Sequence, residues 1–580
     1  MTSPVVVWAL ISLLVALLAA AWVTVRAVAA KQHLDRVQDQ LPSLERALVD
    51  QQMPQAHLIV ARMQADSAAA VRLTHDPLWG MVTQLPILGD NPRAVRKATE
   101  AVDLLVGRSL PSLLRSARLA KPSTLVHGDT VAVDDIAALH APVAQASGTA
   151  SLARRRIREA DGVLLPPVRS AVARLRTRVD GLARALSTAT RATQVLPAML
   201  GRSERRTYLL VVQNPAEARG TGGILGAYGV IEADRGRLRL REISPNSRLK
   251  DSPSLPVALG ADYSALYGND PGVWRNSNLS PHFPHAGRVW LALWQKQFGR
   301  QLDGVVALDP ITLGALVGAT GPISLDAETR LTGATTADFV MSGVYRRFPR
   351  FNQNRPRDRL LARLGELVAT NVLSGRGDPG RLIQAASRAA THRRLLVYST
   401  RPGEQRVLAS GSIGGAMPIS ADPFVEVVVN NGGGNKLDYY LDRMVRYSGG
   451  ACIQGRRSTR ITIVLTNRAP AIGLPPYVTG LTTRDAGVDL PAGTNRLLVY
   501  VFATRGATLQ GAELDGVPVS SMVFGRELRR PVFAFTVNLR PGQSRSAVLA
   551  LTEPASSKPA RIVEQPLVRP QRSVVAATTC

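Results

Sequence analysis

The sequence is poor in cysteine, in aromatic residues and in lysine. Two cysteines in 580 residues, Cys452 and Cys580, cannot form the disulfide framework that holds small secreted domains together. So few thiols fit an exported protein, but the sequence leaves open whether the two meet. Apolar content is ordinary at 45%, so most of the chain is expected to be globular. The length suggests roughly three to four structural units.

Signatures of nucleophilic and metal-dependent catalysis are absent from the sequence. It has no Gly-x-Ser-x-Gly elbow, no Walker loop and no His-Glu-x-x-His motif. His282 and His285 could be metal ligands, but no paired Cys/His framework accompanies them, and a surface or hydrogen-bonding role suits each better. Any catalysis would therefore depend on positioning and charge stabilisation, as phosphoryl transfer can.

Acidic residues are few relative to basic ones, 43 against 71, which gives a net charge of +28. A field of this size favours anionic surroundings, namely nucleic acid, anionic lipid or a polyanionic polymer. No zinc finger, RNA-binding aromatic signature or helix-turn-helix is present, so nucleic acid is not expected as a partner. A GC-rich genome would alone explain why arginine replaces lysine, which occurs only at Lys31, Lys97, Lys121, Lys250, Lys296, Lys436 and Lys558.

The longest uncharged run is Val5 to Val25, 21 residues near the amino terminus. A helix of that length crosses a hydrocarbon core of about 30 Å. We therefore predict a transmembrane anchor at residues 1–27, an uncleaved signal anchor that makes this a single-pass protein of the cell membrane with most of the chain outside. Orientation stays open, because the positive-inside rule taken literally places the chain in the cytoplasm. The basic residues follow the apolar run: Arg26, Lys31 and Arg36.

Periodicity divides the rest of the chain. Apolar residues recur at three- and four-residue spacing over residues 28–200, which predicts a helical stalk or bundle. Strands and helices alternate over 201–400, typical of an α/β domain, and short β-rich runs over 420–555 predict an immunoglobulin-like sandwich. Residues 556–580 are basic, contain Pro and Ser, and are expected to be flexible. The predicted fold class is α/β, with a stalk before it and a β-sandwich-like domain after it.

The stretch NPAEARGTGGILGAYG, residues 214–229, lies between two strand-like runs. It combines Glu217 and Arg219 with a cluster of small residues. A glycine-rich turn can point backbone N–H groups at a bound anion, and an arginine beside it suits a multiply charged oxyanion. The alternative is a tight connection between two core strands, with Glu217 and Arg219 paired to each other.

A second basic cluster, YRRFPRFNQNRPRDRLLARL, surrounds one acid, Asp358, with seven arginines. Guanidinium groups this close together repel unless anions or carboxylates neutralise them. One reading is a phosphate or pyrophosphate site at a helix start, where the helix dipole adds its attraction. The other is a basic loop that caps the following helix through Asp358. The arginines are Arg346, Arg347, Arg350, Arg355, Arg357, Arg359 and Arg363.

Two carboxylates flank the strand-like run DGVVALD, Asp303 and Asp309. Either could hold a divalent cation near phosphates, so Mg²⁺ is left open as a cofactor. The alternatives are structural: Asp309 precedes a proline and can cap the next helix, and Asp303 can occupy a turn.

Three blocks that occur in order resemble one protein family: NPAEARGTGGILGAYGV, WRNSNLSPHFP and LDGVVALDPITLGALVGATGPI. The family is a domain of unknown function in actinobacterial membrane-anchored proteins, and it often accompanies cell-envelope polysaccharide genes. The resemblance covers about Arg206 to Leu373. A more distant similarity is to the LytR-CpsA-Psr phosphotransferases, which move glycopolymers from a polyprenyl-pyrophosphate carrier to peptidoglycan.

The distant similarity implies a ligand site. Arg219 matches the early pyrophosphate-binding arginine of those enzymes, and the late cluster matches Arg355, Arg357, Asp358 and Arg359. It implies an envelope protein that binds a phosphorylated or lipid-linked glycan, with the membrane and that glycan or a cell-wall polymer as partners. The alternatives are a non-catalytic envelope scaffold or polymer-binding protein and, third, a cytoplasmic nucleic-acid binder.

Two departures from the phosphotransferase pattern leave transfer activity open. An Asp-Thr or Asp-Ser pair follows the early arginine in those enzymes, whereas Gly220-Thr221-Gly222 follows Arg219 here. Their late helix carries an Arg-Gln pair, whereas Ala362-Arg363-Leu364 stands at that place. The catalytic residues are therefore not assigned.

Overall fold

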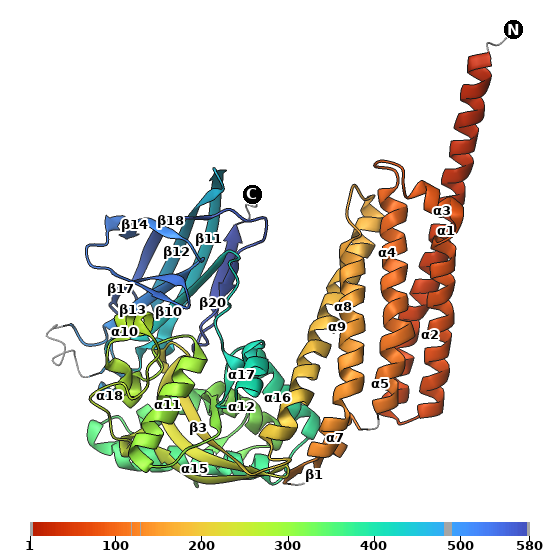
Figure 1. Cartoon of the computed structure of the whole chain (residues 1–580). Coiled ribbons are helices and arrows are strands. Elements are labelled where there is room, and N and C mark those ends of the chain that lie inside the picture. Colours follow the sequence, from red (N-terminus) through yellow and green to blue (C-terminus); the bar gives the residue numbers. More distant parts are fainter. Residues whose placement is uncertain (1–3, 118, 128, 481–489, 577–580) are drawn as a thin grey trace. The chain divides into compact units, whose positions relative to one another are not determined.

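The computed structural model describes the chain except residues 1–3, 118, 128, 481–489 and 577–580. It divides into two compact units (Figure 1). The first comprises Met1–His127 with Val131–Arg202, and the second comprises Gly128–Thr130 with Ser203–Cys580. The boundary after residue 202 lies close to the one that periodicity predicts at residue 200.

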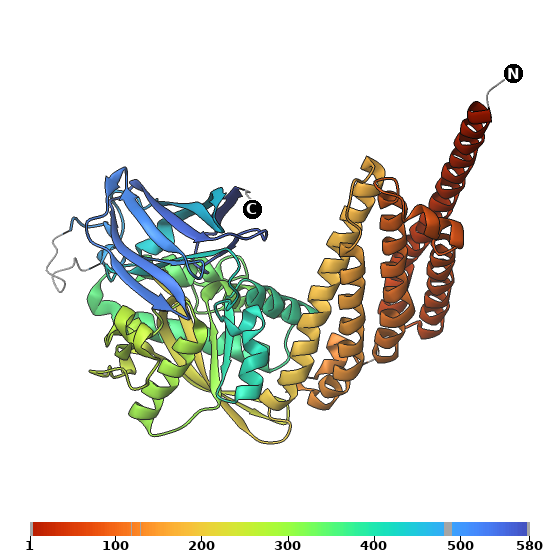
Figure 2. The same cartoon turned by 45° about the horizontal axis from the view of Figure 1, so that its top comes forward.

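The first unit is a bundle of helices, whose long members run alongside one another (Figure 2). Alanines in α4, α8 and α9 let these helices approach closely, and Trp79 is fully buried, with its indole N–H donating to Pro92 O at 3.2 Å. The elements are α1 (Pro4–Val49), α2 (Met53–Thr74), α3 (Pro77–Val82), α4 (Asp90–Leu104), the π-helical η1 (Leu105–Ser109), α5 (Leu110–Ser116), α6 (Pro122–Leu125), β1 (Val126–His127), β2 (Thr130–Val131), α7 (Val133–Ala138), α8 (His140–Arg158) and α9 (Pro166–Met199).

The transmembrane anchor predicted at residues 1–27 is contradicted. The uncharged run opens α1, a helix of 46 residues that continues through Arg26, Lys31 and Asp35 and packs against α2. Among the described residues, no helix is both long and apolar enough to cross a bilayer. The prediction treated the uncharged run as an element by itself, whereas the helix that forms is longer and carries charges over its second half.

The second unit begins with a mixed sheet of seven strands, in the order β1-β2-β5-β4-β3-β6-β9, of which β5, β4, β3, β6 and β9 come from residues 203 onward. Strands β3 and β6 are parallel, and the other pairs from β2 to β9 are antiparallel. The elements are β3 (Arg206–Arg219), β4 (Gly222–Asp234), β5 (Arg237–Pro245), α10 (Ala261–Tyr267), α11 (Phe283–Phe298), β6 (Gly304–Leu308), α12 (Pro310–Thr320), β7 (Ile323–Ser324), β8 (Arg330–Leu331), α13 (Thr336–Asp338), the π-helical η5 (Phe339–Gly343), α14 (Val344–Arg347), α15 (Asn354–Leu373), α16 (Pro379–Thr391), β9 (Leu395–Ser399) and α17 (Pro402–Ala409).

Helices cover both faces of this sheet, which confirms the predicted α/β class. Leu209 and Val211 of β3 and Val305 of β6 pack against α11 through Trp290. On the other face α12 and α15 share a core in which Leu313 meets Leu364. Alternate residues of a strand point to opposite faces, so β3 contributes to both cores.

A β-sandwich follows, with its core between a five-stranded sheet (β16-β17-β13-β10-β19) and a six-stranded sheet (β15-β14-β18-β12-β11-β20). Strands β12 and β18 largely alternate buried and less buried residues, as strands with one buried face do, whereas β10 is buried along its whole length. The elements are β10 (Phe424–Asn431), β11 (Leu441–Ile453), β12 (Arg456–Asn467), α18 (Pro476–Thr479), β13 (Asn495–Ala503), β14 (Thr508–Leu514), β15 (Val517–Pro518), β16 (Val523–Glu527), β17 (Arg530–Leu539), β18 (Ser544–Pro554), β19 (Arg561–Val563) and β20 (Gln571–Ala576). Cys452 of β11 is disulfide-bonded, and Cys580 lies outside the described residues.

The carboxyl-terminal tail was expected to be flexible over residues 556–580, but its described part, residues 556–576, adds a strand to each sheet. Strand β19 pairs in parallel with β10, and β20 pairs in parallel with β11. Between them Gln565 is fully buried and bridges two strands, because its amide contacts both Val429 N and Arg219 O. Composition alone suggested disorder. The prediction was wrong because this short segment pairs with strands that lie far away in the sequence.

Candidate functional site

The candidate site lies where the β3–β4 hairpin meets the sandwich. The tip of the hairpin is anchored by Asp438, a fully buried carboxylate in the η8 turn (Leu437–Tyr440) that accepts a 2.7 Å hydrogen bond from Ala218 N. Burial raises the pKa of Asp438, and hydrogen bonds from Ala218 N, Asn495 and Asn431 offset part of that rise. The hairpin tip is thus fixed to the sandwich.

The glycines of the hairpin turn serve close packing. A Cβ at Gly220 would lie 2.2 Å from Leu279 O, so the backbone there leaves no room for a side chain. Gly222 has a φ of +137°, which other residues rarely adopt. Thr221 is buried and donates to Gln213 Oε1 at 2.6 Å. The turn is therefore the tight connection considered as an alternative from the sequence.

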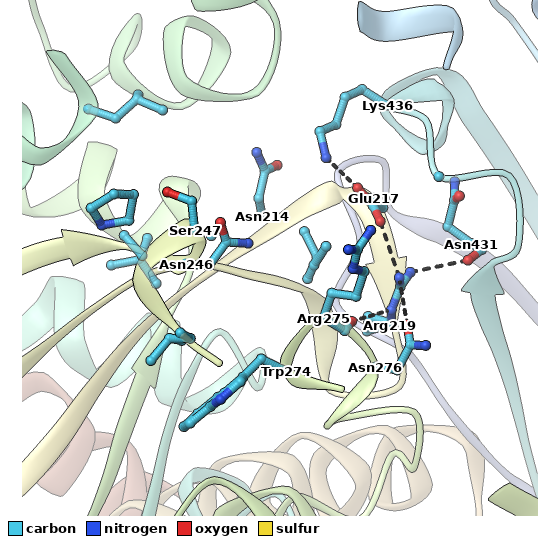
Figure 3. Close-up of a pocket in the computed structure, with 18 of the residues that line it drawn as sticks. Asn214, Glu217, Arg219, Asn246, Ser247, Trp274, Arg275, Asn276, Asn431 and Lys436 are labelled. Atoms are coloured by element: carbon cyan, nitrogen blue, oxygen red, sulfur yellow. Dashed lines mark hydrogen bonds and ion pairs between the residues drawn. The ribbon is translucent and has the colours of Figure 1, made fainter. Parts of the chain in front are cut away.

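Arg219, predicted as a pyrophosphate ligand, uses all of its donors inside the protein. It is only 3% exposed, and a guanidinium group has five N–H groups. Five acceptors take them, at 2.8 to 3.2 Å: Nε donates to Arg275 O, Nη1 donates to Ala218 O and Asn431 O, and Nη2 donates to Glu217 Oε1 and Asn276 Oδ1. Figure 3 shows four of these five contacts. A ligand could reach Arg219 only by displacing one of them.

Glu217 is paired with Arg219 and also with Lys436, which lies on the loop between β10 and β11. The ammonium group of Lys436 donates to Glu217 Oε2, and both side chains are at least nine-tenths buried. Burial raises the pKa of Glu217, but the charges of Lys436 and Arg219 outweigh it, so the pKa is lowered overall. Burial likewise disfavours the charged form of Lys436, but Glu217 raises its pKa above the ordinary value.

Arg357, on the buried face of α15, has a donor to spare. The residue is 5% exposed, and its guanidinium carbon lies 4.1 Å from the ring centroid of Tyr477 and 5.7 Å from that of Tyr345. Its Nη2 group pairs with Asp358 Oδ1 at 3.2 Å. Its Nη1 group is buried and has no hydrogen-bond partner among the described residues. A buried unpaired donor is costly and calls for a partner.

Arg219, Glu217, Lys436 and Arg357 line one pocket, with a volume of about 840 Å³. Its apolar walls come from β4, β5, α12, η5 and α15: Ile224, Ile243, Leu313, Val340, Leu361 and Leu364. The pocket is therefore amphipathic, with apolar walls and a charged end. Figure 3 shows part of the pocket.

Arg275 belongs to the charged end and was not predicted. It lines the pocket, is exposed, and its side chain makes no hydrogen bond or ion pair within the described part of the chain. The charges that lower the pKa of Glu217 are Lys436, Arg219 and Arg275, so three cations surround this carboxylate. The acidic and basic residues of the whole lining balance each other in charge, because Asp251 and Asp270 also line the pocket. The positive charge is concentrated around Glu217.

The remaining predicted ligands do not all meet at this pocket. Asp358 lines it, whereas Arg355 and Arg359 are exposed and absent from its lining. A helix from Asn354 onward turns them away, because residues two positions apart in a helix lie on different faces. The predicted cluster thus contributes Arg357 and Asp358 to the pocket and leaves its other two arginines outside.

The two carboxylates considered for a metal have structural roles. Asp309 caps α12, accepting from Thr312 N at 2.8 Å, and it pairs with Arg394 at 2.5 Å. Asp303 accepts from Thr207 N at 2.8 Å. The described residues contain no group of three His, Cys, Asp or Glu side chains that could hold a metal ion. Mg²⁺ therefore remains a prediction that no protein ligand set supports.

The two histidines are hydrogen-bonded to the protein. His285 Nδ1 lies 2.8 Å from Glu527 Oε1, and His282 Nδ1 accepts from Met417 N at 3.0 Å. Both contacts join the α/β domain to later segments of the chain, as the hydrogen-bonding alternative anticipated.

Lys436 and Arg275 are the lining cations that the sequence did not indicate. Lysine is scarce in this chain, and Lys436 follows a run of glycines and asparagines, which is the one local signal that could have singled it out. Arg275 lies within the WRNSNLSPHFP block. Nothing in a single sequence indicates that these segments meet Glu217.

Comparisons with known proteins give one match to a family. No curated protein matches the chain. A solved structure, described as a two-domain M1 zinc metallopeptidase mutant bound to L-arginine, is similar over 22% of this chain and 22% of that chain, with 14% identity and a TM-score of 0.12. A likeness this small supports no statement about fold or function. Residues 203–345 match the family model described as "Protein of unknown function (DUF4012)", in agreement with the predicted resemblance to a family of unknown function.

Proposed function

We propose that the second unit binds a phosphorylated, lipid-linked glycan of the cell envelope in this pocket. The lipid would lie along the apolar walls, and the phosphates would lie at the charged end. The observation that carries the proposal is the buried, unpaired Nη1 donor of Arg357, which lines a cavity of about 840 Å³. That volume falls within the range of ligand sites. An anionic oxygen is the partner that such a donor favours.

Three cations would share the phosphate contacts. Arg357 offers its free donor, and Lys436 has donors beyond the one given to Glu217. The Arg275 side chain lines the pocket and forms no hydrogen bond or ion pair with the described residues. Arg219 takes a different role from the one implied by the resemblance. Because its five donors are used within the protein, it fixes Glu217 and the loop that carries Arg275. It is a positioning residue.

Transfer of the glycan is an extension of this proposal, supported by the distant similarity to the LytR-CpsA-Psr phosphotransferases. The acceptor hydroxyl would form a new P–O bond, the bond to the prenyl phosphate would break, and the hydroxyl proton would pass to a base. Glu217 is a poor base, because Arg219 and Lys436 hold it ionised and lower its pKa. We therefore propose binding as the primary function, with Mg²⁺ arriving together with the phosphates if it takes part.

A direct test is calorimetric binding of farnesyl pyrophosphate to the purified chain, with and without Mg²⁺. Arg357→Met should weaken binding at least about tenfold, the effect of losing roughly 1.4 kcal/mol. Arg355→Met is the matched control, because it removes an exposed arginine from the same helix. Inorganic pyrophosphate and farnesol separate the two halves of the ligand. Equal affinity in the Arg357 and Arg355 variants, or no binding in either condition, would refute the proposal.

A second candidate is a non-catalytic envelope scaffold, favoured by the closed network around Arg219. Each of its five donors already has an acceptor, as a purely structural ion-pair cluster requires. This candidate predicts that variants of Arg219 and Arg357 change only stability, with no prenyl pyrophosphate bound by the unaltered chain.

A further inference from the structure

One end of the helical bundle of the first unit displays a cluster of exposed apolar side chains. They lie on α3, on the α3–α4 loop and on the α8–α9 loop, and their exposed fractions run from 46% to 72%. We call this surface the apolar rim; it consists of Leu78, Met81, Leu85, Ile87, Leu88, Val163 and Leu165. Clusters of exposed large apolar residues in a soluble setting are unfavourable and indicate a binding surface.

The two loops of the apolar rim are joined into one surface. Val163 N donates to Asp90 Oδ2 at 2.8 Å, and Leu165 N donates to Asn91 Oδ1 at 2.9 Å. The side-chain amide of Asn91 returns a bond to Val163 O at 3.3 Å. In Figure 1 both loops lie at the end of the bundle beyond which α1 continues to its first residues.

The loop backbone is arranged to display its apolar tip. Ile87 has a φ of +63°, a left-handed conformation that is a genuine outlier for a β-branched residue, and its side chain is 68% exposed. Nearby N–H groups are bonded within the loop, since Gly89 N donates to Leu85 O and Asp90 N donates to Ile87 O. Strain of this kind persists where the surroundings impose it, commonly at functional positions.

The rest of this end of the bundle indicates the partner. Helix α1 continues past the rim with Trp8, Leu14, Leu17 and Leu18 exposed, and farther along it the guanidinium of Arg26 stacks over Trp22 at 4.4 Å. Tryptophan beside a cation is typical of the headgroup region of a bilayer. The rim consists of side chains on loop tips, which suits insertion into a soft surface. The net charge of +28 favours an anionic one.

We propose that the apolar rim rests on an anionic lipid surface, with Ile87, Leu88 and Val163 in the boundary between headgroups and acyl chains. The contact is interfacial, and the loops do not cross the bilayer. Hydrogen bonds within the loops make this arrangement tolerable, because backbone groups that enter a water-poor region must already have partners. The proposal is independent of the pocket in the second unit.

The test places an environment-sensitive fluorophore on the full chain, kept oxidised so that Cys452 stays in its disulfide. One variant carries the label through Leu88→Cys, at a residue 72% exposed, and the control carries it through Leu58→Cys, at a residue 62% exposed on α2. The vesicles are made of phosphatidylcholine with about one-third phosphatidylglycerol, which gives them an anionic surface. The label at position 88 should shift to shorter wavelength and be quenched by lipids spin-labelled near the headgroup, and the label at 58 should do neither. Equal responses at the two positions, or none, would overturn the proposal.

Two further results distinguish the rim from a structural loop and from a dimer contact. Ile87→Gly relieves the strained φ, so the chain should become no less stable. The affinity for vesicles, measured from the quenching at position 88, should fall about tenfold because an apolar side chain is lost. Unchanged quenching in Ile87→Gly would overturn the role of this side chain. A blue shift at position 88 that depends on protein concentration and needs no vesicles would show instead that a second copy covers the rim.

Discussion

The ammonium group of Lys436 pairs with the carboxylate of Glu217 across 219 residues of sequence. One partner lies on the β10–β11 loop of the sandwich and the other on β3 of the α/β domain. The pair is at least nine-tenths buried on both sides, so the surroundings screen it little and each charge depends on the other. It is a buried ion pair that connects the two domains of the second unit.

Removing one partner of this pair should be costly. Lys436→Met removes one of the two cations that contact the buried Glu217 carboxylate, and we expect the unfolding free energy to fall by roughly 3–5 kcal/mol. Urea denaturation followed by circular dichroism measures the change. Adding Glu217→Gln to Lys436→Met should recover part of it, because the buried carboxylate that Lys436 neutralised is then removed, while Arg219 keeps its acceptors on Arg275, Ala218, Asn431 and Asn276. A double variant as unstable as the sum of both single variants would contradict this account.

The same carboxylate should make stability depend on pH. Because the pKa of Glu217 is lowered in the folded state, its contribution is present above the ordinary value of 4.5 and is lost as pH falls through the folded pKa. Unfolding free energy should therefore decrease below about pH 4.5 more steeply in the unaltered chain than in Glu217→Gln. Denaturation curves at pH 7, 4.5 and 3.5 on both proteins test this; parallel pH profiles would exclude it.

Arg219 and Arg357 should differ in how much each contributes to the stability of the folded chain. Arg219→Met strips five acceptors of their donor and should cost about 3 kcal/mol or more. Arg357→Met removes a donor with no partner and frees Asp358, which reaches solvent, so stability should change by about 1 kcal/mol or less. Thermal unfolding of the two variants compares them. A larger loss in Arg357→Met would mean that its role is structural.

Gly220 should tolerate no side chain. Gly220→Ala places a Cβ against Leu279 O, a backbone atom that cannot swing away, and should destabilise the chain by about 1–3 kcal/mol. Gly148→Ala in α8 is the matched control, since nothing lies within 4 Å of a Cβ there. That control should be stabilising by about 0.5–1 kcal/mol. A Gly220→Ala chain as stable as the control would show that the hairpin tip is loosely held.

Gln565 should behave as a core residue despite its place in the tail. Gln565→Leu leaves Val429 N, Val429 O and Arg219 O without their partner, and we expect a loss of about 2 kcal/mol or more. The surface change Gln510→Leu is a suitable control, because that side chain is exposed. Hydrogen exchange at Val429 reports the effect locally, and unaltered protection there would contradict it.

Much of the fold could be predicted because periodicity is local. The change from helical spacing to alternating strands, and then to short β-rich runs, separates the three kinds of architecture. The tail could not be placed, since its strands are defined by pairing with β10 and β11, over a hundred residues away. The uncharged run at the amino terminus was misread because its length was judged apart from the helix it opens.

The candidate site could be predicted in part. Helical geometry explains why Arg357 lines the pocket with Leu361 and Leu364, since these residues recur at the spacing of one helix face, whereas Arg355 and Arg359 fall on another. The pairing of Glu217 with Arg219 was one of the two alternatives considered, and it could be predicted because the two residues are close in the sequence. The contact of Lys436 with Glu217 could not be predicted, because no local pattern links two segments that meet only when the sandwich folds.

The hairpin tip also bears on how this protein could have been inherited. The segment that matches the family model ends at residue 345, well before Lys436, Asp438 and Gln565, which hold that tip. Genetic recombination that moved the segment alone would separate Glu217 from Lys436, one of its two ion-pair partners, and expose the strand that ends in Arg219. We therefore expect α/β domain and sandwich to be exchanged between genes as one block, and a breakpoint between them to be selected against.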